Sequence, residues 1–277
     1  MPKPASLEAV LLAGARELLA AHARELPQRD DLCGAFCGAL ALHAAGVGER
    51  EGRALDQDDV ALAAGSVVSD SRDAHTLPAG ETGRRDYRLR PPLVADAAVS
   101  GTTAAGLLEA IEQLADGALA AIPLAGPWSA ESLDGVFDAL AQIERPVSVL
   151  ANIATRHLWG GRARSEQILG YLYEGSLAGP PADWDVGHFV SVFARIGGPA
   201  GSMYAIADTY PALGNAGVHV QPRELLASAL ERRDMPAGGM IVVVSAHDAE
   251  PVRASASALG LDERAWDNGS VSAETRP

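Results

Sequence analysis

The two cysteines of this 277-residue chain, Cys33 and Cys37, stand four residues apart in the segment CGAFCGALALHAAG. Four chemistries could explain the pair: a disulfide, half of a metal site, two buried apolar residues, or one nucleophile beside a packing residue. A disulfide between residues one helical turn apart would distort the helix. A structural zinc site needs a second Cys or His pair at ligand spacing, and the sequence offers none nearby. No metal is therefore expected, and the last two readings remain open.

Cys33 lies where a thiolate would be stabilised. It follows the polar segment 26–32, which contains Pro27, and it begins an apolar segment that should form a helix ending at Gly46. Unpaired N–H groups and the positive end of the dipole favour a thiolate in the first helical turn. Cys37 lies one turn later on the same face, deeper in the apolar run. Because free cysteine is among the most buried residue types, both could also be core residues.

A nucleophilic thiol requires a base and a group that orients the base. His188 begins the alternating segment GHFVSVFARI, and Asp208 ends the next strand-like segment, SMYAIAD. A hairpin folded about Pro199 would pair Asp208 with Val190. His188 would then lie diagonally across from Asp208 on the same face, within side-chain reach, whereas a one-residue slip would separate them. The sequence thus predicts a triad of Cys33, His188 and Asp208.

The segment CGAFCGALALHAAG resembles the nucleophile helix of the C39 peptidases, papain-like cysteine peptidases that remove leader peptides from bacterial secreted peptides. Their helix carries a glycine thirteen positions after the cysteine, a spacing that Cys33 and Gly46 share and Cys37 does not. The resemblance covers about residues 28–230, in the family's order. It implies that Cys33 is the nucleophile, that Cys37 packs behind it, and that Gln28 shares an oxyanion hole with the Cys33 backbone N–H.

Three features depart from the family's pattern. Gln28 precedes the cysteine by five residues where six is usual, and Asp208 is followed by Thr-Tyr-Pro where Asp-Pro is commoner. The segments 67–100 and 156–186 are longer than a minimal member needs. These differences leave the substrate open.

The surrounding pattern predicts the α+β class, with helices first and a sheet assembled late. We expect one papain-like domain over 1–277, with an N-terminal helix within 1–25 and an additional strand and helix within 231–265. The N-terminal helix should span Ser6–Glu25, and the last dozen residues should fray. The other helices are expected at 55–65, 101–117, 129–142, 221–230 and 250–259. Strands are expected at 118–126, 146–153, 187–196, 202–210 and 240–245.

The composition limits the partners. The formal net charge of −14 argues against nucleic acid and against anionic membranes, which require a basic face. The chain lacks an apolar run long enough to cross a bilayer, and its N-terminus lacks a signal-peptide plan. We therefore expect a soluble cytoplasmic protein without a cofactor, and its oligomeric state stays open.

Three functions follow from these residues. The leading one is a cysteine peptidase or amidase that cleaves a peptide-like amide bond through an acyl-thioester on Cys33. The first alternative is a biosynthetic acyltransferase, amide-forming or cyclising, in which an amine intercepts the same acyl-enzyme and the long segments exclude water. The second is a catalytically inactive peptide-binding module, against which the complete Cys, His and Asp set argues.

Two further groups of residues have both a functional and a structural reading. Three tryptophans could line the cleft or simply pack: Trp128, Trp159 and Trp184. Four arginines could bind a substrate carboxylate or form a solvated face: Arg84, Arg85, Arg88 and Arg90.

Overall fold

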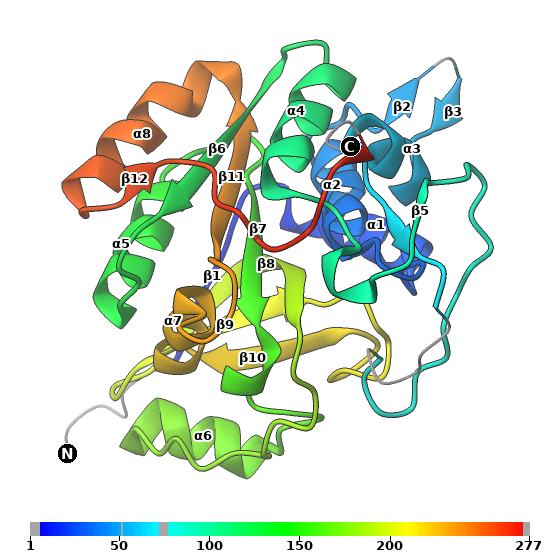
Figure 1. Ribbon diagram of the computed structural model, residues 1–277. Helices are drawn as coiled ribbons and strands as arrows, with labels where there is room; N and C mark the ends of the chain where they lie inside the picture. The colour runs from blue at the N-terminus through cyan, green and yellow to red at the C-terminus, as the bar shows by residue number, and fades with distance from the viewer. Residues whose placement is uncertain (1–5, 51, 72–76, 274–277) are drawn as a thin grey trace, which may run out of the picture.

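The computed structural model describes residues 6–50, 52–71 and 77–273 of the chain. An eight-stranded antiparallel sheet forms the centre of the molecule, and helices pack on both of its faces (Figure 1). The chain therefore has a mixed α+β structure, which is the class that the sequence predicts.

The strands, in chain order, are β1 (Glu8–Leu11), β2 (Glu49–Arg50), β3 (Arg53–Ala54), β4 (Val68–Ser69), β5 (Leu93–Val94), β6 (Leu119–Ala125), β7 (Ser148–Ala154), β8 (Gly187–Gly197), β9 (Ser202–Ala207), β10 (Val218–Pro222), β11 (Gly239–Ser245) and β12 (Asp262–Glu263). The helices are α1 (Ala15–Glu25), α2 (Cys33–Ala44), α3 (Gln57–Ala63), α4 (Ala104–Leu114), α5 (Ala130–Leu140), α6 (Ser165–Glu174), α7 (Arg223–Glu231) and α8 (Ala249–Ala258). Within the described ranges, no helix has the length and apolar composition needed to span a membrane.

The sheet runs in the order β10-β9-β8-β7-β11-β6-β12, with β1 paired to β8 outside this path. Strand β8 is long enough to pair with three strands. Strand β9 pairs with one edge of it, and on the other edge β7 pairs with its first six residues and β1 with its last four. A β-bulge between Val192 and Ala194 interrupts the β8–β9 register, and bulges of this kind bend a strand. His188 is the second residue of β8 and lies close to the end of β9.

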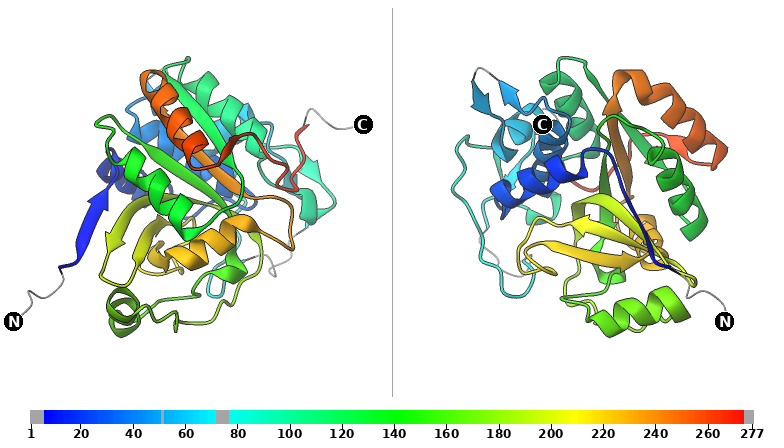
Figure 2. Two further views of the ribbon diagram at one scale, coloured as in Figure 1. Left: turned by 90° about the vertical axis from the view of Figure 1, so that its left-hand side faces the viewer. Right: turned by 180° about the vertical axis from the view of Figure 1, so that it is seen from behind.

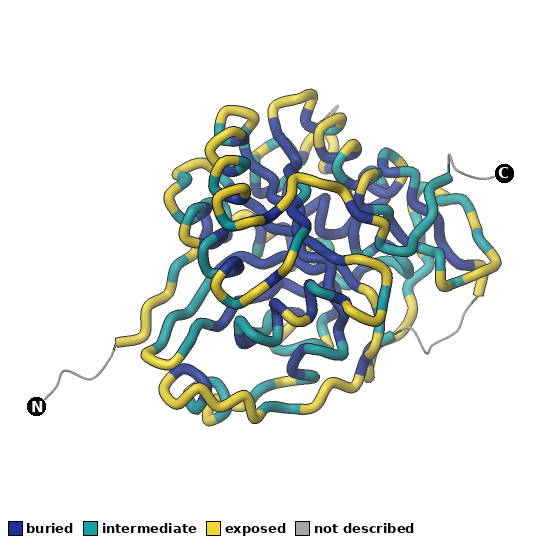
Figure 3. The backbone as a smooth tube through the Cα atoms, turned by 60° about the vertical axis from the view of Figure 1, so that its left-hand side comes forward, coloured by how far each residue is buried: buried dark blue, intermediate teal, exposed yellow. Residues whose placement is uncertain are grey.

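Helices cover both faces of the sheet (Figure 2), and a hydrophobic cluster lies on each side of it. Helices α1 to α4 contribute to the first cluster, together with Phe189 and Phe193 of β8. Helices α5, α7 and α8 contribute to the second, together with Val190 and Val192 of the same strand. Successive residues of β8 therefore face opposite layers, as the period of a strand requires. Figure 3 shows the buried chain concentrated at this centre and the exposed chain around it.

Helix α2 runs through the first cluster and has the expected limits. It begins at Cys33, and most of its side chains are buried. A Cβ on Gly38 would lie 2.8 Å from Val60 and 2.9 Å from Leu107, so this glycine lets α3 and α4 approach closely. Gly46 follows the helix with a φ of 76°, in the left-handed region that favours glycine, and its N–H donates to the carbonyl of His43.

The helix predicted over Ser6–Glu25 is wrong in its first half. Residues Glu8–Leu11 form β1, and α1 begins only at Ala15, after Gly14 with a φ of 85°. The apolar spacing of this segment suits a helix, but the edge of β8 beyond its pairing with β7 has free backbone groups. Pairing with β1 satisfies those groups, an advantage that local sequence does not reveal.

The additional strand and helix expected within 231–265 correspond to β11, which lies between β7 and β6 inside the sheet, and to α8. Other predictions about the later part of the chain need correction. The long connection 156–186 contains α6, and the chain before α7 forms β10. The tail does not fray over 266–273: the Trp266 side chain is 6% exposed, and its indole N–H donates to Asn152. Residues 274–277 lie outside the described residues.

The docked tail gives a stability prediction. Replacing Trp266 with Ala removes an indole that packs in the first hydrophobic cluster. We expect the free energy of unfolding to fall by about 3 kcal/mol in urea denaturation, the cost typical of removing a buried aromatic side chain. The exposed neighbour Arg264 is the matched control, and its replacement with Ala should change stability by less than about 0.5 kcal/mol. Equal, small effects of both substitutions would contradict the docked tail.

Candidate active site

The Cys33 thiol lies at the first turn of α2, on the wall of a pocket of about 910 Å³. Leu32 precedes the helix and offers no side-chain acceptor, so the first-turn N–H groups are left without a side-chain cap. Cys33 is partly exposed, whereas Cys37 is fully buried, and both are free thiols. Burial raises the pKa of the Cys37 thiol well above its ordinary value. Of the two cysteines, only Cys33 faces the pocket.

The β8–β9 hairpin brings His188 and Asp208 together. The ladder ends with Ser191 opposite Ala207, so the next pair in this register is Val190 and Asp208, as the sequence predicts. The Nε2–H of His188 donates to Asp208 Oδ1 at 3.0 Å. Both side chains are 3% exposed, so the pair is screened from solvent.

The charge state of His188 follows from its neighbours. Burial alone would lower its pKa, but the charge and hydrogen bond of Asp208, together with the nearby Cys33, raise the pKa of His188 to about 10. The protonated imidazole is therefore favoured at neutral pH. Because Nε2 donates to Asp208, Nδ1 is the nitrogen left for the Cys33 thiol. The structure brings the three predicted residues together, and their catalytic roles stay a prediction.

Two aromatic rings fix the plane of the imidazole. Trp184 meets the His188 ring edge-on, with centroids 4.8 Å apart, and Tyr210 stacks on it at 6.2 Å. The two aromatic rings also contact each other at 5.7 Å. Burial raises the pKa of Tyr210, and the negative charge of a Cys33 thiolate would raise it further, so this phenol stays neutral beside the site.

Sequence reasoning missed a second histidine on Asp208. The Nε2–H of His219, on β10, donates to Asp208 Oδ2 at 3.1 Å. Its Nδ1 accepts from Gln221, whose amide also exchanges two hydrogen bonds with the backbone of Trp159. Gln221 thereby orients the His219 ring so that the Nε2–H of His219 faces the Asp208 carboxylate. The alternation Val-His-Val at 218–220 was the available signal, because it is typical of a strand.

A third histidine, His22, forms a hydrogen bond with the backbone of Asp208. The buried His22 of α1 donates from Nε2 to the Asp208 carbonyl oxygen at 2.6 Å. Burial is the main reason that the pKa of His22 is lowered, which favours a neutral ring that donates one N–H. Asp208 is therefore held by histidines from α1, β8 and β10.

Thr209 connects this carboxylate to Gln28. Its hydroxyl donates to Gln28 Oε1 at 2.5 Å and lies 3.2 Å from His188 Nε2, while its backbone N–H donates to Asp208 Oδ1 at 2.7 Å. With Oε1 occupied, the Nε2 amide group of Gln28 is the part available to a ligand in the pocket, which Gln28 lines. This orientation suits an oxyanion donor. Sequence reasoning identified Gln28 but not the threonine that orients it.

The pocket draws its walls from distant parts of the chain. Described residues of segment 67–100, whose role the sequence left open, line it, among them Ser69, Ser71 and Arg85, and so do residues 268–270 of the tail. Of the three tryptophans, only Trp184 lines this pocket. Trp128 packs in the second hydrophobic cluster, and Trp159 packs on Tyr171 of α6 with ring centroids 6.4 Å apart.

The arginines of segment 67–100 are mostly occupied. Arg84 forms an ion pair with Asp86, and Arg88 forms ion pairs with acidic residues at the start of α3. Arg90 is exposed. Arg85 lines the pocket, and its guanidinium donates to the carbonyls of Ser69 and Ser71. The four arginines thus do not form one carboxylate site.

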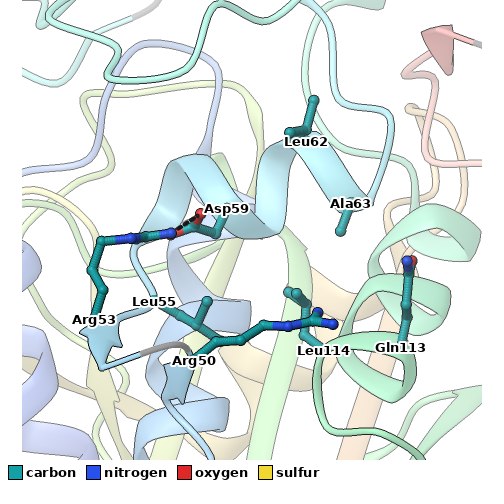
Figure 4. Close-up of a pocket in the computed structure, with 8 residues that line it drawn as sticks. All are labelled: Arg50, Arg53, Leu55, Asp59, Leu62, Ala63, Gln113 and Leu114. Carbon is teal, nitrogen blue, oxygen red and sulfur yellow. Dashed lines mark hydrogen bonds and ion pairs between the residues drawn. The ribbon is translucent and has the colours of Figure 1, made fainter.

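A second pocket, of about 600 Å³, lies between the β2–β3 hairpin, α3 and α4 (Figure 4). Arg53 on its rim pairs with Asp59 at 2.7 Å, and Arg50 extends toward Leu114 and Gln113. The residues that line it include no cysteine, serine or histidine, and the one carboxylate among them, that of Asp59, is paired with Arg53. Across the described ranges, no group of three or more His, Cys, Asp or Glu residues is arranged to hold a metal ion.

Comparison with known proteins gives a family. The matching family model is described as a family of unknown function, DUF6885, and it covers residues 12–267. A search of curated proteins found no match. Among solved structures, digestive procathepsin L 3 of Tenebrio molitor larval midgut matches with 15% identity and a TM-score of 0.34, over 82% of this chain and 69% of that one. This likeness is too distant to carry an argument about activity.

The different surroundings of the two cysteines give a chemical prediction. Iodoacetamide at mildly acidic pH should alkylate Cys33 and leave Cys37 unmodified, because Cys37 is fully buried and its pKa is raised. Mass spectrometry of the digested protein measures the two sites separately. Equal labelling, or faster labelling of Cys37, would contradict the position of the nucleophile.

Proposed function

The chain belongs to the DUF6885 family, and from this premise we propose that it is a cysteine-dependent hydrolase that cleaves a peptide-like amide bond through an acyl-thioester on Cys33. One observation carries the proposal. The His188 ring donates to the buried carboxylate of Asp208, and His188 and the partly exposed Cys33 both line one pocket of about 910 Å³. A nucleophile, a base and an orienting group in this relation are what acyl transfer requires.

The proposed first half-reaction forms the acyl-enzyme. Cys33 Sγ, its proton held on His188 Nδ1, attacks the carbonyl carbon and forms a C–S bond. The oxygen of the tetrahedral intermediate accepts hydrogen bonds from the Gln28 side-chain amide and the Cys33 backbone N–H. The C–N bond then breaks as His188 returns its proton to the leaving amine, which departs and leaves the thioester.

The second half-reaction releases the acid. Water gives a proton to His188 as its oxygen attacks the thioester carbonyl, and the C–S bond breaks as the acid leaves. Asp208 remains ionised throughout. Burial alone would raise its pKa, but the charge and hydrogen bonds of His188 and His219 hold the pKa of this carboxyl below its usual range. A fixed carboxylate keeps the imidazole in one orientation in both steps.

The papain-like fold and the resemblance to the C39 peptidases belong to this proposal. The chain order Gln28, Cys33, His188 and Asp208 supports them, as does a nucleophile at a helix start facing a strand-borne histidine. Together with the net charge of −14, this arrangement favours a peptide-like or acyl small-molecule substrate over nucleic acid.

A second candidate function is transfer of the acyl group to an amine. The observation that favours it is the pocket wall, to which described residues of segment 67–100 and residues 268–270 contribute. Walls of this kind can exclude water and leave room for an amine nucleophile. The same acyl-enzyme serves both outcomes, so one experiment can separate them.

Intact-protein mass spectrometry after incubation with candidate peptides and peptide thioesters tests the proposal. We expect an acyl adduct on Cys33, and Cys33→Ala should lower turnover by at least about a thousandfold because it removes the nucleophile. Cys37→Ala, one turn away on the same helix, is the matched control and should form the same adduct. A Cys33→Ala protein that keeps its turnover would refute the proposal. With added amine, an amide product that replaces the free acid identifies a transferase, and free acid alone identifies a hydrolase.

A further inference from the structure

Arg232 is a buried cation in the wall of the candidate active-site pocket. The residue is 2% exposed and follows the last turn of α7. No acidic side chain within residues 6–50, 52–71 and 77–273 forms an ion pair with it, whereas most other buried or half-buried arginines have such a partner. A buried charge without a counterion is costly. The site is therefore built at a cost to stability.

The hydrogen bonds of Arg232 leave part of its guanidinium unused. Nη1 donates to the side-chain oxygen of Asn152, a neutral acceptor that also accepts from the indole of Trp266. The Nε atom of Arg232 is buried and has no hydrogen-bond partner. An arginine fork with an unpaired buried N–H group offers a ready site for a carboxylate, which accepts two parallel hydrogen bonds.

The backbone adds a second cost at the same residue. Arg232 has a φ of 45°, in the left-handed region that residues with a side chain rarely adopt. Strain of this kind persists where the surrounding structure requires it and concentrates at functional sites. Here it directs the side chain into the pocket wall rather than into solvent.

Two glycines make room for the guanidinium beside the catalytic residues. A Cβ on Gly187, the residue before His188, would lie 2.5 Å from Arg232 Nη2, and a Cβ on Gly238 would lie 2.6 Å from Arg232 Cδ. Arg232, Cys33 and His188 line the same pocket. A ligand held by Arg232 would therefore share this pocket with the Cys33 thiol.

We propose that Arg232 binds a carboxylate of the substrate close to the bond that Cys33 attacks. The inference rests on the proposed function and deepens it, because it names the substrate class: an acyl compound or peptide with a carboxylate near the scissile bond. A monovalent carboxylate fits better than a dianion, since Asp30 and Asp31 line the same pocket. Arg85, the other arginine of the pocket, is less suited because three backbone carbonyls already accept from it.

Paired alkylating reagents that differ only in a carboxylate test this proposal on the full-length protein. The first pair is iodoacetate and iodoacetamide, and the second, with longer reach, is N-iodoacetylglycine and N-iodoacetylglycinamide. The measured quantity is the ratio of the anionic to the neutral rate of Cys33 alkylation. In at least one pair, Arg232→Gln should lower this ratio by about tenfold or more, as expected for loss of a charge-assisted hydrogen bond, and Arg232→Lys should retain part of it.

Asn152→Asp gives an independent second variant. It keeps Arg232 in place but supplies an internal carboxylate at the position that already accepts from Nη1. The ratio of the anionic to the neutral alkylation rate should therefore fall by the same factor as in Arg232→Gln. This variant tests the proposal even if Arg232→Gln does not fold.

Each other outcome counts against a stated part of the account. If both rates fall together and the ratio is unchanged in both pairs, Arg232 acts on the thiolate and the inference is overturned, while the proposed function stands. If Cys33 of the unmodified protein reacts with none of the four reagents, the proposed nucleophile fails, and the inference fails with it.

Discussion

The carboxylate of Asp208 is almost fully buried, and the packing of the surrounding elements depends on compensating its charge. A buried charge is tolerated only when donors compensate it, and Asp208 accepts from His188, from His219 and from the Thr209 backbone N–H. His22 adds a hydrogen bond to its carbonyl. The donors to the carboxylate come from β8, β10 and the chain after β9, so the carboxylate can remain ionised only if those elements dock together, and His22 of α1 holds the backbone of the same residue. The candidate site and the packing of this region therefore depend on one interaction.

Local sequence was sufficient to predict the parts of the site that local rules control. Cys33 stands between a polar segment with a proline and an apolar run, and the helix begins there. His188 and Asp208 follow from the turn at 198–201 and the two-residue period of the strands, because the register across a hairpin is set by its turn. The position of the turn and the alternation of the strands were enough to predict that both residues lie within reach of each other.

Residues that act through long-range contacts were not predictable in this way. Thr209 orients Gln28 across 181 positions of sequence, and β1 forms because an edge of β8 far along the chain is open. Arg232 carries no local signal at all: at the end of a helix an arginine is normally a solvated side chain, and only the folded chain shows it buried without an acidic partner among the described residues. The substrate is therefore better inferred from the pocket than from any motif.

The central claim is that His188 is a charged ring held between Asp208 and Cys33. NMR of the imidazole nitrogens of His188, assigned with a His188→Gln variant, tests it most directly. Because the pKa of His188 is raised to about 10, the account predicts that both nitrogens carry protons between about pH 6 and 8, and that Cys33→Ala lowers this pKa. A single neutral tautomer across that range in the unmodified protein would contradict the account.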